Sequence, residues 1–436
     1  MNSCAVIGRR MGAGVLFVVI LPSASSMAAS LTLEQAWAIA ERTNPVLRAA
    51  QARLDAAVGE RTDSQSLLFN NPAVSAEAGR RRIRDGSDSG DASDWSVGIA
   101  QTFELFGQRD ARREAAERTA AAVQTDIEEA RRALRAEVER RFVTVLALQE
   151  AIELEQGAVE LIDATAGIVR KRVAAGEDSR LEGNLATVEA ERARNELARL
   201  GEQLVAARAA LASLLQLPED ELPVATGVLD PIPRTYRLQE LLDAVDRRPA
   251  LRANDLRLQA ARHRLDLERA ARYPDLTVGI SQAKEGGLDG RDTISTLSLS
   301  LPLPVFRRNA AGIGRAITEM NQASIERETA QRDARAQVIA VWDRRDKLAA
   351  RLRRLRESVL PRLEENVRLS QAALQAGAIG LAEWILAQRQ ALEGRRDLTQ
   401  ARTDLRLLQV DLEAAAGVNV AVPTAERVTS APRGRE

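Results

Sequence analysis

The side chains that most often hold metals or perform catalysis are scarce in this sequence. His263, the only histidine of 436 residues, lies between Arg262 and Arg264, and Cys4 is the only cysteine. Protein sites for zinc and its neighbours combine several Cys, His or carboxylate ligands, so we expect no metal site and no cofactor. No set of nucleophile, base and orienting residue can be assembled, and no glycine-rich phosphate loop follows a strand. We therefore predict that the protein is not an enzyme.

Two glycines are each followed, six residues later, by a glutamate. These pairs are Gly176 with Glu182 and Gly377 with Glu383. Glycine adopts a left-handed backbone conformation at little cost, so both glycines are predicted to end a helix where the chain reverses. Ser179 stands three residues before Glu182, the spacing of a capping box at a helix start. The second segment has glycine in place of the serine, so its cap is predicted to be weaker.

Charge and composition exclude some classes of partner. The chain carries 62 Lys and Arg against 62 Asp and Glu, so no net field gathers nucleic acid or an anionic substrate. Aromatic residues make up 3% of the chain, and Ala, Leu, Glu, Arg and Gln are abundant. This composition is typical of long helices, so the fold is predicted to be mainly α with a small β part.

A long helical pattern runs from Arg109 to Ala175, turns at Gly176 and continues to Leu217. Its apolar residues recur every seven positions, with a second series three or four residues out of phase, as in a coiled-coil seam. The two series are Val138, Val145, Ile152, Val159, Ala166 and Val173, and Leu134, Leu148, Ile162 and Val169. A run of about 67 residues is about 100 Å long, too long for a compact domain.

The chain is a duplication. Residues 31–57 align with 236–261, which places Pro45 opposite Pro249, and the segment around Gly176 matches the one around Gly377. Each half opens with a helix that is predicted to break at its proline. The predicted division is a signal peptide 1–28, a first repeat 29–217, a linker 218–235, a second repeat 236–418 and a flexible C-terminal tail 419–436. The first repeat contains a helix, a β-hairpin 72–104 and a long helical hairpin 109–217. The second contains a helix, a β-hairpin 274–303 and a long helical hairpin 310–418.

Each half also contains two stretches in which apolar and small polar residues alternate with the period of a β-strand. Their upstream members begin at Pro72 and Pro274, and the connecting segments 80–93 and 283–292 are predicted to be solvated hairpin tips. The apolar positions of the downstream strands include Trp95, Val97 and Ile99 in the first half and Leu297, Leu299 and Leu301 in the second.

The N-terminus has the features of a secretory signal. Arg9 and Arg10 precede an apolar stretch from Gly12 to Leu21, and Ser26-Met27-Ala28 offers a small-residue cleavage site. No stretch of about 20 apolar residues follows, so any membrane passage is expected to use strands. The alternation also fits an ordinary antiparallel sheet with one solvated face. Export, and the lack of an element to cover four apolar strand faces, favour a sheet closed into a membrane barrel by several copies.

The order of signal, broken helix, hairpin, very long helix, glycine turn and helix, followed by its repetition, resembles the TolC-like outer membrane factors. These are the exit ducts of tripartite efflux and secretion systems, and the resemblance covers residues 31–418. The segments most similar to the cobalt-zinc-cadmium (heavy-metal) efflux branch are GIAQTFELFGQRDARREAA at 98–116 and LSLPLPVFRRNAAGIGRA at 299–316. The resemblance implies a homotrimer in the outer membrane of a Gram-negative cell, with a twelve-stranded transmembrane β-barrel, four strands per subunit, on a periplasmic tunnel of coiled-coil hairpins.

The resemblance also implies partners and sites. The partners would be a periplasmic adaptor (membrane fusion) protein, an inner-membrane pump of the resistance-nodulation-division type and outer membrane lipid. The turns at Gly176 and Gly377 would form the periplasmic mouth where the adaptor docks, with Glu182 and Glu383 near the place where the family has acidic residues. The lipid-facing residues would be Trp95, Val97, Ile99, Leu297, Leu299 and Leu301. Solvated or lumen-lining faces are expected for Glu128, Glu129, Arg131 and Arg132.

Three functions remain open at this point. The first is a passive duct that exports divalent heavy-metal cations while a pump supplies energy and selection. The second is a duct of the same family for drugs or for a secreted protein, which the genes next to this one would distinguish. The third is an exported structural coiled-coil protein, which predicts a soluble, elongated particle that never fractionates with the outer membrane.

Overall fold

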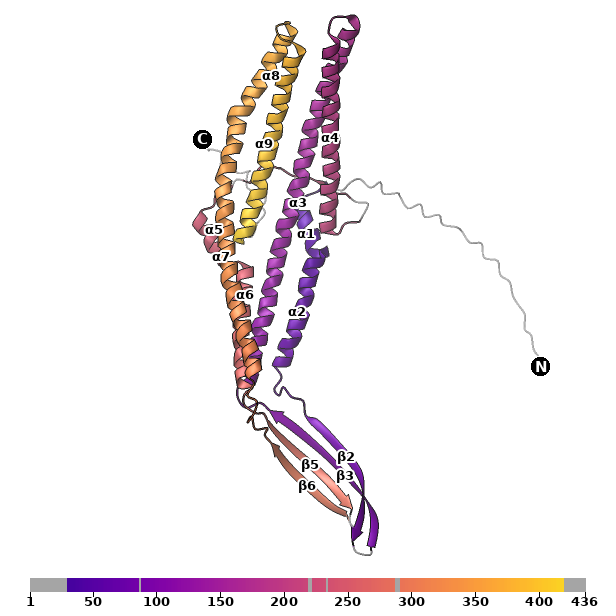
Figure 1. Cartoon of the computed structure of the whole chain (residues 1–436), viewed down its shortest axis with the longest axis vertical. Helices are drawn as coiled ribbons and strands as arrows, with labels where there is room; N and C mark the ends of the chain where they lie inside the picture. Colours follow the sequence, from indigo (N-terminus) through magenta and orange to yellow (C-terminus); the bar gives the residue numbers. More distant parts are fainter. Residues whose placement is uncertain (1–29, 86–87, 219–221, 233, 287–290, 419–436) are drawn as a thin grey trace, which may run out of the picture.

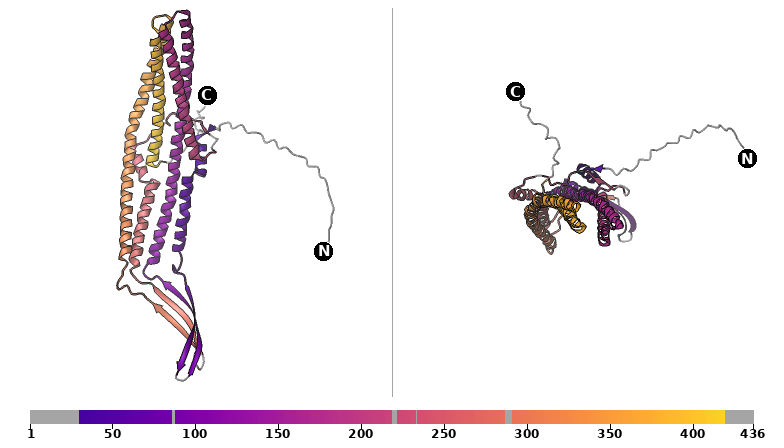
Figure 2. Two further views of the ribbon diagram at one scale, coloured as in Figure 1. Left: turned by 45° about the vertical axis from the view of Figure 1, so that its right-hand side comes forward. Right: turned by 90° about the horizontal axis from the view of Figure 1, so that it is seen from above.

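The computed structural model describes residues 30–85, 88–218, 222–232, 234–286 and 291–418. The predicted signal peptide and C-terminal tail lie outside these residues. The described chain is a long rod of helices that carries a β-sheet at one end (Figure 1). Seen along the rod, the helices form a curved layer rather than a closed bundle (Figure 2). The fold is therefore mainly α with a small β part, as predicted.

The first half begins with two helices that meet at a proline. Its elements are α1 (Leu33–Thr43), α2 (Pro45–Ser64), β2 (Ala73–Asp85), β3 (Asp88–Phe103), α3 (Gln108–Ala175) and α4 (Arg180–Leu215). Asn44 adopts an extended conformation between α1 and α2, and its side chain accepts a hydrogen bond from the N–H of Val46 at 2.9 Å. Pro45 occupies the first turn of α2, where its missing N–H costs nothing. The predicted break at Pro45 is confirmed.

The second half repeats this order with one interruption. Its elements are α5 (Leu238–Val245), α6 (Pro249–Ala270), β5 (Leu276–Gly286), β6 (Arg291–Ser300), α7 (Ala310–Arg354), the π-helical turn η1 (Leu355–Val359), α8 (Leu360–Gln375) and α9 (Leu381–Ala416). Pro361 follows η1 and has no N–H to donate to the preceding turn. A π-helical turn absorbs this missing bond, whereas α3 runs for 68 residues without a break.

The four main strands form one antiparallel sheet in the order β2-β3-β5-β6. They are longer than predicted: β2 extends to Asp85 and β3 begins at Asp88, so most of segment 80–93 is strand rather than hairpin tip. The same holds for 283–292, where β5 reaches Gly286. Cross-strand ion pairs such as Arg82 with Asp91, at 3.3 Å, let these polar ends keep strand pairing in water.

A second, small sheet was not predicted. β1 (Ser30–Leu31) pairs in parallel with β4 (Val224–Ala225), which lies within the predicted linker. The side chain of Gln149 on α3 accepts from the N–H of Ala225 at 3.1 Å and donates to its carbonyl at 3.0 Å. The linker is therefore bound to the middle of the rod, and the described residues contain two short strands besides the four that were predicted.

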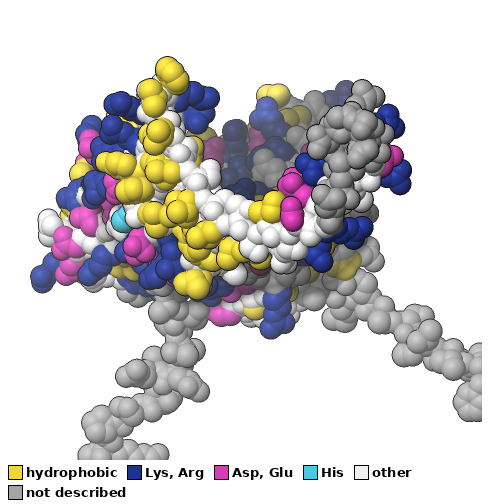
Figure 3. Space-filling view, turned by 90° about the horizontal axis from the view of Figure 1, so that it is seen from below, with side chains coloured by type: hydrophobic (Ala, Val, Ile, Leu, Met, Phe, Trp, Pro, Cys, Tyr) yellow, Lys and Arg dark blue, Asp and Glu magenta, His cyan; other side chains and the backbone are white. Residues whose placement is uncertain are grey.

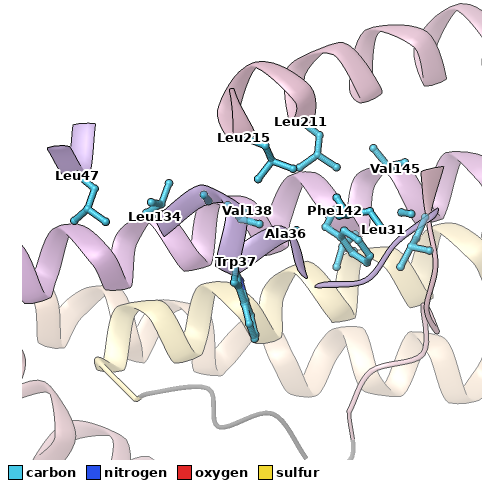
Figure 4. Packing of buried hydrophobic residues seen from close by; sticks show 14 of the residues in the cluster. Leu31, Ala36, Trp37, Leu47, Leu134, Val138, Phe142, Val145, Leu211 and Leu215 are labelled. Atoms are coloured by element: carbon cyan, nitrogen blue, oxygen red, sulfur yellow. The ribbon is translucent and has the colours of Figure 1, made fainter. Parts of the chain in front are cut away.

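The largest core lies where α1, α3, α4 and this small sheet meet (Figure 4). Val138 and Val145 of the predicted seam are fully buried there, together with Phe142 of α3 and Leu211 and Leu215 of α4. Helix α3 also packs against α2, α6 and α9, so it contacts helices of both halves. The periodic seam of α3 is thus buried within the chain over this central region.

Charged groups are buried next to this core. Arg406 of α9 donates to Glu139 of α3 at 2.6 Å, and the two side chains are only 7% and 1% exposed. Burial raises the pKa of Glu139, and the attraction of Arg406 offsets this only in part. About two turns farther along α9, Glu413 accepts hydrogen bonds from Tyr236 at 2.7 Å and from Arg234 at 3.0 Å. The segment before α5 is therefore bound to α9 through a buried carboxylate.

Replacing Arg406 by leucine should destabilise the protein by about 3 to 5 kcal/mol, because Glu139 is left buried without its cation. Combining it with Glu139→Leu should recover most of this loss, since neither charge then remains. The measurement is the thermal unfolding midpoint of the purified protein. Arg194→Leu, which breaks the exposed pair with Asp163, is the control and should cost less than about 1 kcal/mol. Equal losses for both arginine variants would contradict this ranking.

Candidate functional site

The turn between α3 and α4 is held by backbone and by charge. Gly176 has φ +80°, and the N–H of Glu177 donates to the carbonyl of Arg172 at 2.9 Å, the closing bond of a Schellman motif. The Arg172 guanidinium also pairs with Asp178 at 2.9 Å. This turn is therefore a polar structure that satisfies its own hydrogen bonds.

The turn between α8 and α9 has the same backbone and different side chains. Gly377 has φ +69°, and the N–H of Ala378 donates to the carbonyl of Ala373 at 2.8 Å. Ala373 stands where the first turn has its arginine, and Ile379 stands where it has the paired aspartate. Ile379 packs against a hydrophobic cluster instead of forming an ion pair. The two turns thus share a fold but differ in charge.

Both candidate glutamates cap the helices that follow these turns. The Glu182 carboxylate accepts from the N–H and the hydroxyl of Ser179, each at 2.9 Å, so the predicted capping box is present. The Glu383 carboxylate accepts from the N–H of Gly380 at 2.6 Å. The backbone N–H and the hydroxyl of Ser179 lower the pKa of Glu182. Both carboxylates stand at the end of the rod farthest from the sheet.

A tryptophan that the sequence analysis did not single out joins the two hairpins near these turns. Trp384 is 3% exposed, and its indole N–H donates to Gln371 at 2.7 Å. With Leu381 it packs on small residues of the first hairpin, namely Ala166, Val169, Ala186 and Ala190. The matching residue of the first repeat is Gly183, where a Cβ would lie 3.2 Å from Val173. The sequence did contain a sign of this contact, because the first repeat has glycine where the second has tryptophan.

Beside this cluster a cavity of about 340 Å³ separates the hairpins. Its apolar wall includes Leu154, Leu161 and Trp384, and its polar wall includes Glu189 and Arg389, which lie 3.6 Å apart. The two hairpins are thus in close contact at the Trp384 cluster and are separated by a cavity beside it.

The sheet presents one apolar face. Strand pairing puts Ile99, Ile280 and Leu297 in one row and Val278 beside Leu299 in the next. Ile99, Ile280, Leu297 and Leu299 are exposed and Val278 is half-buried, and hydrophobic side chains gather on the sheet when it is viewed from its free end (Figure 3).

The predicted apolar positions fall on this face, with one exception at the strand end. Trp95, Val97 and Ile99 of β3 alternate with Ser96 and Gly98, which point to the opposite face together with Ser281, Thr296 and Ser298. Leu301 is an exception because β6 ends at Ser300, so this residue lies one position beyond the strand.

The expectation that the helix charges lie on solvated or lumen-lining faces is wrong for two of the four residues named. Glu129 and Arg132 are mostly buried, and Glu129 also accepts from Arg248 of the second half at 2.7 Å. Burial opposes ionisation of Glu129, but the hydrogen bonds from Arg132 and Arg248 outweigh it and lower its pKa. Arg131 and Glu128 are largely exposed, as expected.

No group of three or more His, Cys, Asp or Glu side chains that could hold a metal ion occurs among the described residues. None of the described helices combines the length and the apolar character that a membrane-crossing helix needs.

The fold recurs in proteins of known structure. The CmeC outer membrane channel of Campylobacter jejuni superimposes with a TM-score of 0.75 over 88% of this chain and 85% of its own, at 14% identity. The chain therefore has the fold of an outer membrane channel subunit. The family model described as outer membrane efflux protein matches residues 38–216 and 241–418. The chain belongs to the outer membrane efflux protein family.

Two relatives indicate the range of this family. The cobalt-zinc-cadmium resistance protein CzcC of Cupriavidus metallidurans is 28% identical over 88% of this chain and 88% of its own length. The pyoverdine export outer membrane protein OpmQ of Pseudomonas putida is 26% identical over 68% of this chain and 66% of its own. The TolC-like resemblance and its heavy-metal branch are thus supported.

Acid should weaken the first turn through Glu182. Because the pKa of this carboxyl is lower in the folded protein than its ordinary value of 4.5, its stabilising effect is complete above that value and is lost as the pH falls through the folded pKa. Thermal unfolding midpoints measured below pH 4.5 should fall less steeply for Glu182→Gln than for the wild type. Glu177→Gln is the control. If the midpoint of Glu182→Gln fell with pH as steeply as that of the wild type, the stabilising role of the Glu182 cap would be contradicted.

Proposed function

We propose that the protein is the outer membrane component of a tripartite efflux system, a passive duct from the periplasm to the exterior. The observation that carries this proposal is a four-stranded sheet with one exposed apolar face. Within the described residues, β2 and β6 each pair on one side only. Unpaired strand edges cannot persist in hydrocarbon, so copies of the chain would have to join edge to edge around a closed barrel.

We infer that the closed assembly is a homotrimer with twelve strands, as the family resemblance implies. The apolar face would contact outer membrane lipid, and the Ser and Gly face would line water. From Phe103 to Trp95 this face extends roughly 27 Å along β3 at about 3.4 Å per residue. Once tilted, that length suits an apolar band of about 25 Å.

Aromatic side chains flank this band, as in membrane barrels. Phe106 stacks on Tyr273 with ring centroids 4.8 Å apart at the helix end of the sheet, and Phe306 there is 98% exposed. Trp95 stands near the other end. These positions support a sheet that meets two membrane interfaces, with the helical rod in the periplasm. Residues 1–28 would act as the signal peptide for export, and 218–235 would link the two repeats.

The two turns would then form the periplasmic mouth, at the end of the rod away from the membrane. Gly176 and Gly377 would shape the turns, Glu182 and Glu383 would place carboxylates there, and the periplasmic adaptor would dock there. The inner-membrane pump of the resistance-nodulation-division type would supply energy and selection, as the family resemblance implies.

The similarity to CzcC supports divalent heavy-metal cations as the exported substrate. Deleting the gene should sensitise the cell to cobalt, zinc or cadmium, and a copy on a plasmid should restore resistance. Unchanged metal sensitivity together with a new sensitivity to organic compounds would refute metal cations as the substrate and would still support an efflux duct.

The lipid-facing register can be tested with two neighbouring residues of β6. Leu299→Arg should prevent assembly of a detergent-stable trimer, because arginine at a lipid-facing midplane position costs about 2 to 4 kcal/mol. Ser298→Arg should assemble, because its side chain would face water. Crosslinking and mass measurement in detergent give the readout. The reverse pattern would shift the register by one residue, and a wild-type monomer that is soluble without detergent would refute the membrane assembly.

Glu383→Gln should lower the cation preference of the trimer in planar-bilayer conductance, because a ring of carboxylates at the mouth attracts cations. If Glu383 acts only as a cap, the variant should lose about 1 kcal/mol of stability without any change in ion selectivity. Glu364→Gln, on α8, is the control. An unchanged cation-to-anion permeability ratio would refute a role of Glu383 in ion passage at the mouth.

A further inference from the structure

The apolar face of the sheet ends in a set of basic residues. Lys284 of β5 pairs directly with Trp95 of β3, in the last row of the apolar band. The row of Trp95 also contains Ala78 of β2 and Thr293 of β6. Arg80 and Arg291 each lie two residues from these positions, so they are on the same face and farther from the helices. We call Arg80, Lys284 and Arg291 the basic rim.

The basic rim is available to a ligand. All three side chains are exposed, and none of them forms an ion pair with another described residue. Arg82 lies on the same face but already pairs with Asp91 at 3.3 Å, so it is left out of the rim. Three cations without a counter-ion among the described residues therefore lie at the end of an apolar surface.

The opposite face at the same level has the opposite charge. Asp94, Glu285 and Asp292 point to that face, and Arg81 lies among them, 3.3 Å from Asp94 and 3.7 Å from Glu285. The two faces nevertheless differ in which charges are paired: Asp91 on the apolar side is paired with Arg82 and Arg81 on the polar side is paired with Asp94, whereas the basic rim has no such partner among the described residues.

We propose that the basic rim binds the phosphate groups of lipid headgroups in the outward-facing leaflet of the membrane. This inference rests on the proposed function, in which the apolar face contacts lipid. Trp95 marks the level of the membrane interface, where indole rings concentrate, and headgroup phosphates lie directly beyond it. Arg and Lys side chains form strong charge-assisted hydrogen bonds with phosphate oxygens. Asp94, Glu285 and Asp292 lie on the water side, away from these phosphates.

The first test uses the wild-type trimer and needs no variant. Its affinity for a bisphosphorylated glycolipid in mixed micelles should exceed that for the same lipid without phosphates by about 100-fold, as expected for three cations at a membrane surface. Excess inorganic phosphate should displace little of the bound lipid. Equal affinity for both lipids, or displacement by inorganic phosphate at low concentration, would overturn the proposal.

The second test removes the rim by changing Arg80, Lys284 and Arg291 together to glutamine. The preference for the phosphorylated lipid should fall to near unity. The control variant changes three exposed arginines of α7, Arg344, Arg353 and Arg354, to glutamine and should keep the full preference. A rim variant that retains the preference would overturn the proposal.

Trimer assembly in detergent separates this inference from the proposed function. A wild type that forms membrane-inserted trimers but shows no phosphate preference overturns the basic rim alone. A wild type that forms no membrane-inserted trimer overturns both.

Discussion

The structure depends on covering the apolar side of one very long helix. Helix α3 has 68 residues, about 100 Å, and no other helix of the described residues is as long. It is covered in sections by α2 and α6 near the sheet, by α1 and α9 in the middle, and by α4 toward the turn. The two halves of the duplicated chain are therefore joined along α3 rather than folded as separate units.

Ion pairs formed by buried carboxylates of α3 add specificity to this packing. Glu139 with Arg406 and Glu155 with Arg396 both join α3 to α9, at 2.6 Å in each case. Buried pairs contribute little net stability, because desolvation offsets their attraction. A shifted helix would nevertheless leave a charge unpaired in the interior, so these pairs select one alignment of α9 on α3.

The duplication supplies similar backbones that have diverged in role. The first turn is polar and satisfies its own hydrogen bonds, whereas the second carries Ile379 and Trp384 into a shared apolar cluster. The π-helical turn before Pro361 is confined to the second half within the described residues. Equivalent positions can therefore serve the self-contained turn in one repeat and the contact between hairpins in the other.

The sequence alone determined what local signals control. The limits of α3, the break at Pro45, the capping box at Ser179 and the face to which Val97 points follow from spacing over a few residues. The tertiary structure decided the rest. Glu139 and Arg406 are 267 residues apart, and nothing in their local sequence distinguishes them from solvated charges. The extension of the strands and the pairing of β1 with β4 likewise depend on groups brought together only by folding, because burial and cross-strand pairing are properties of distant contacts.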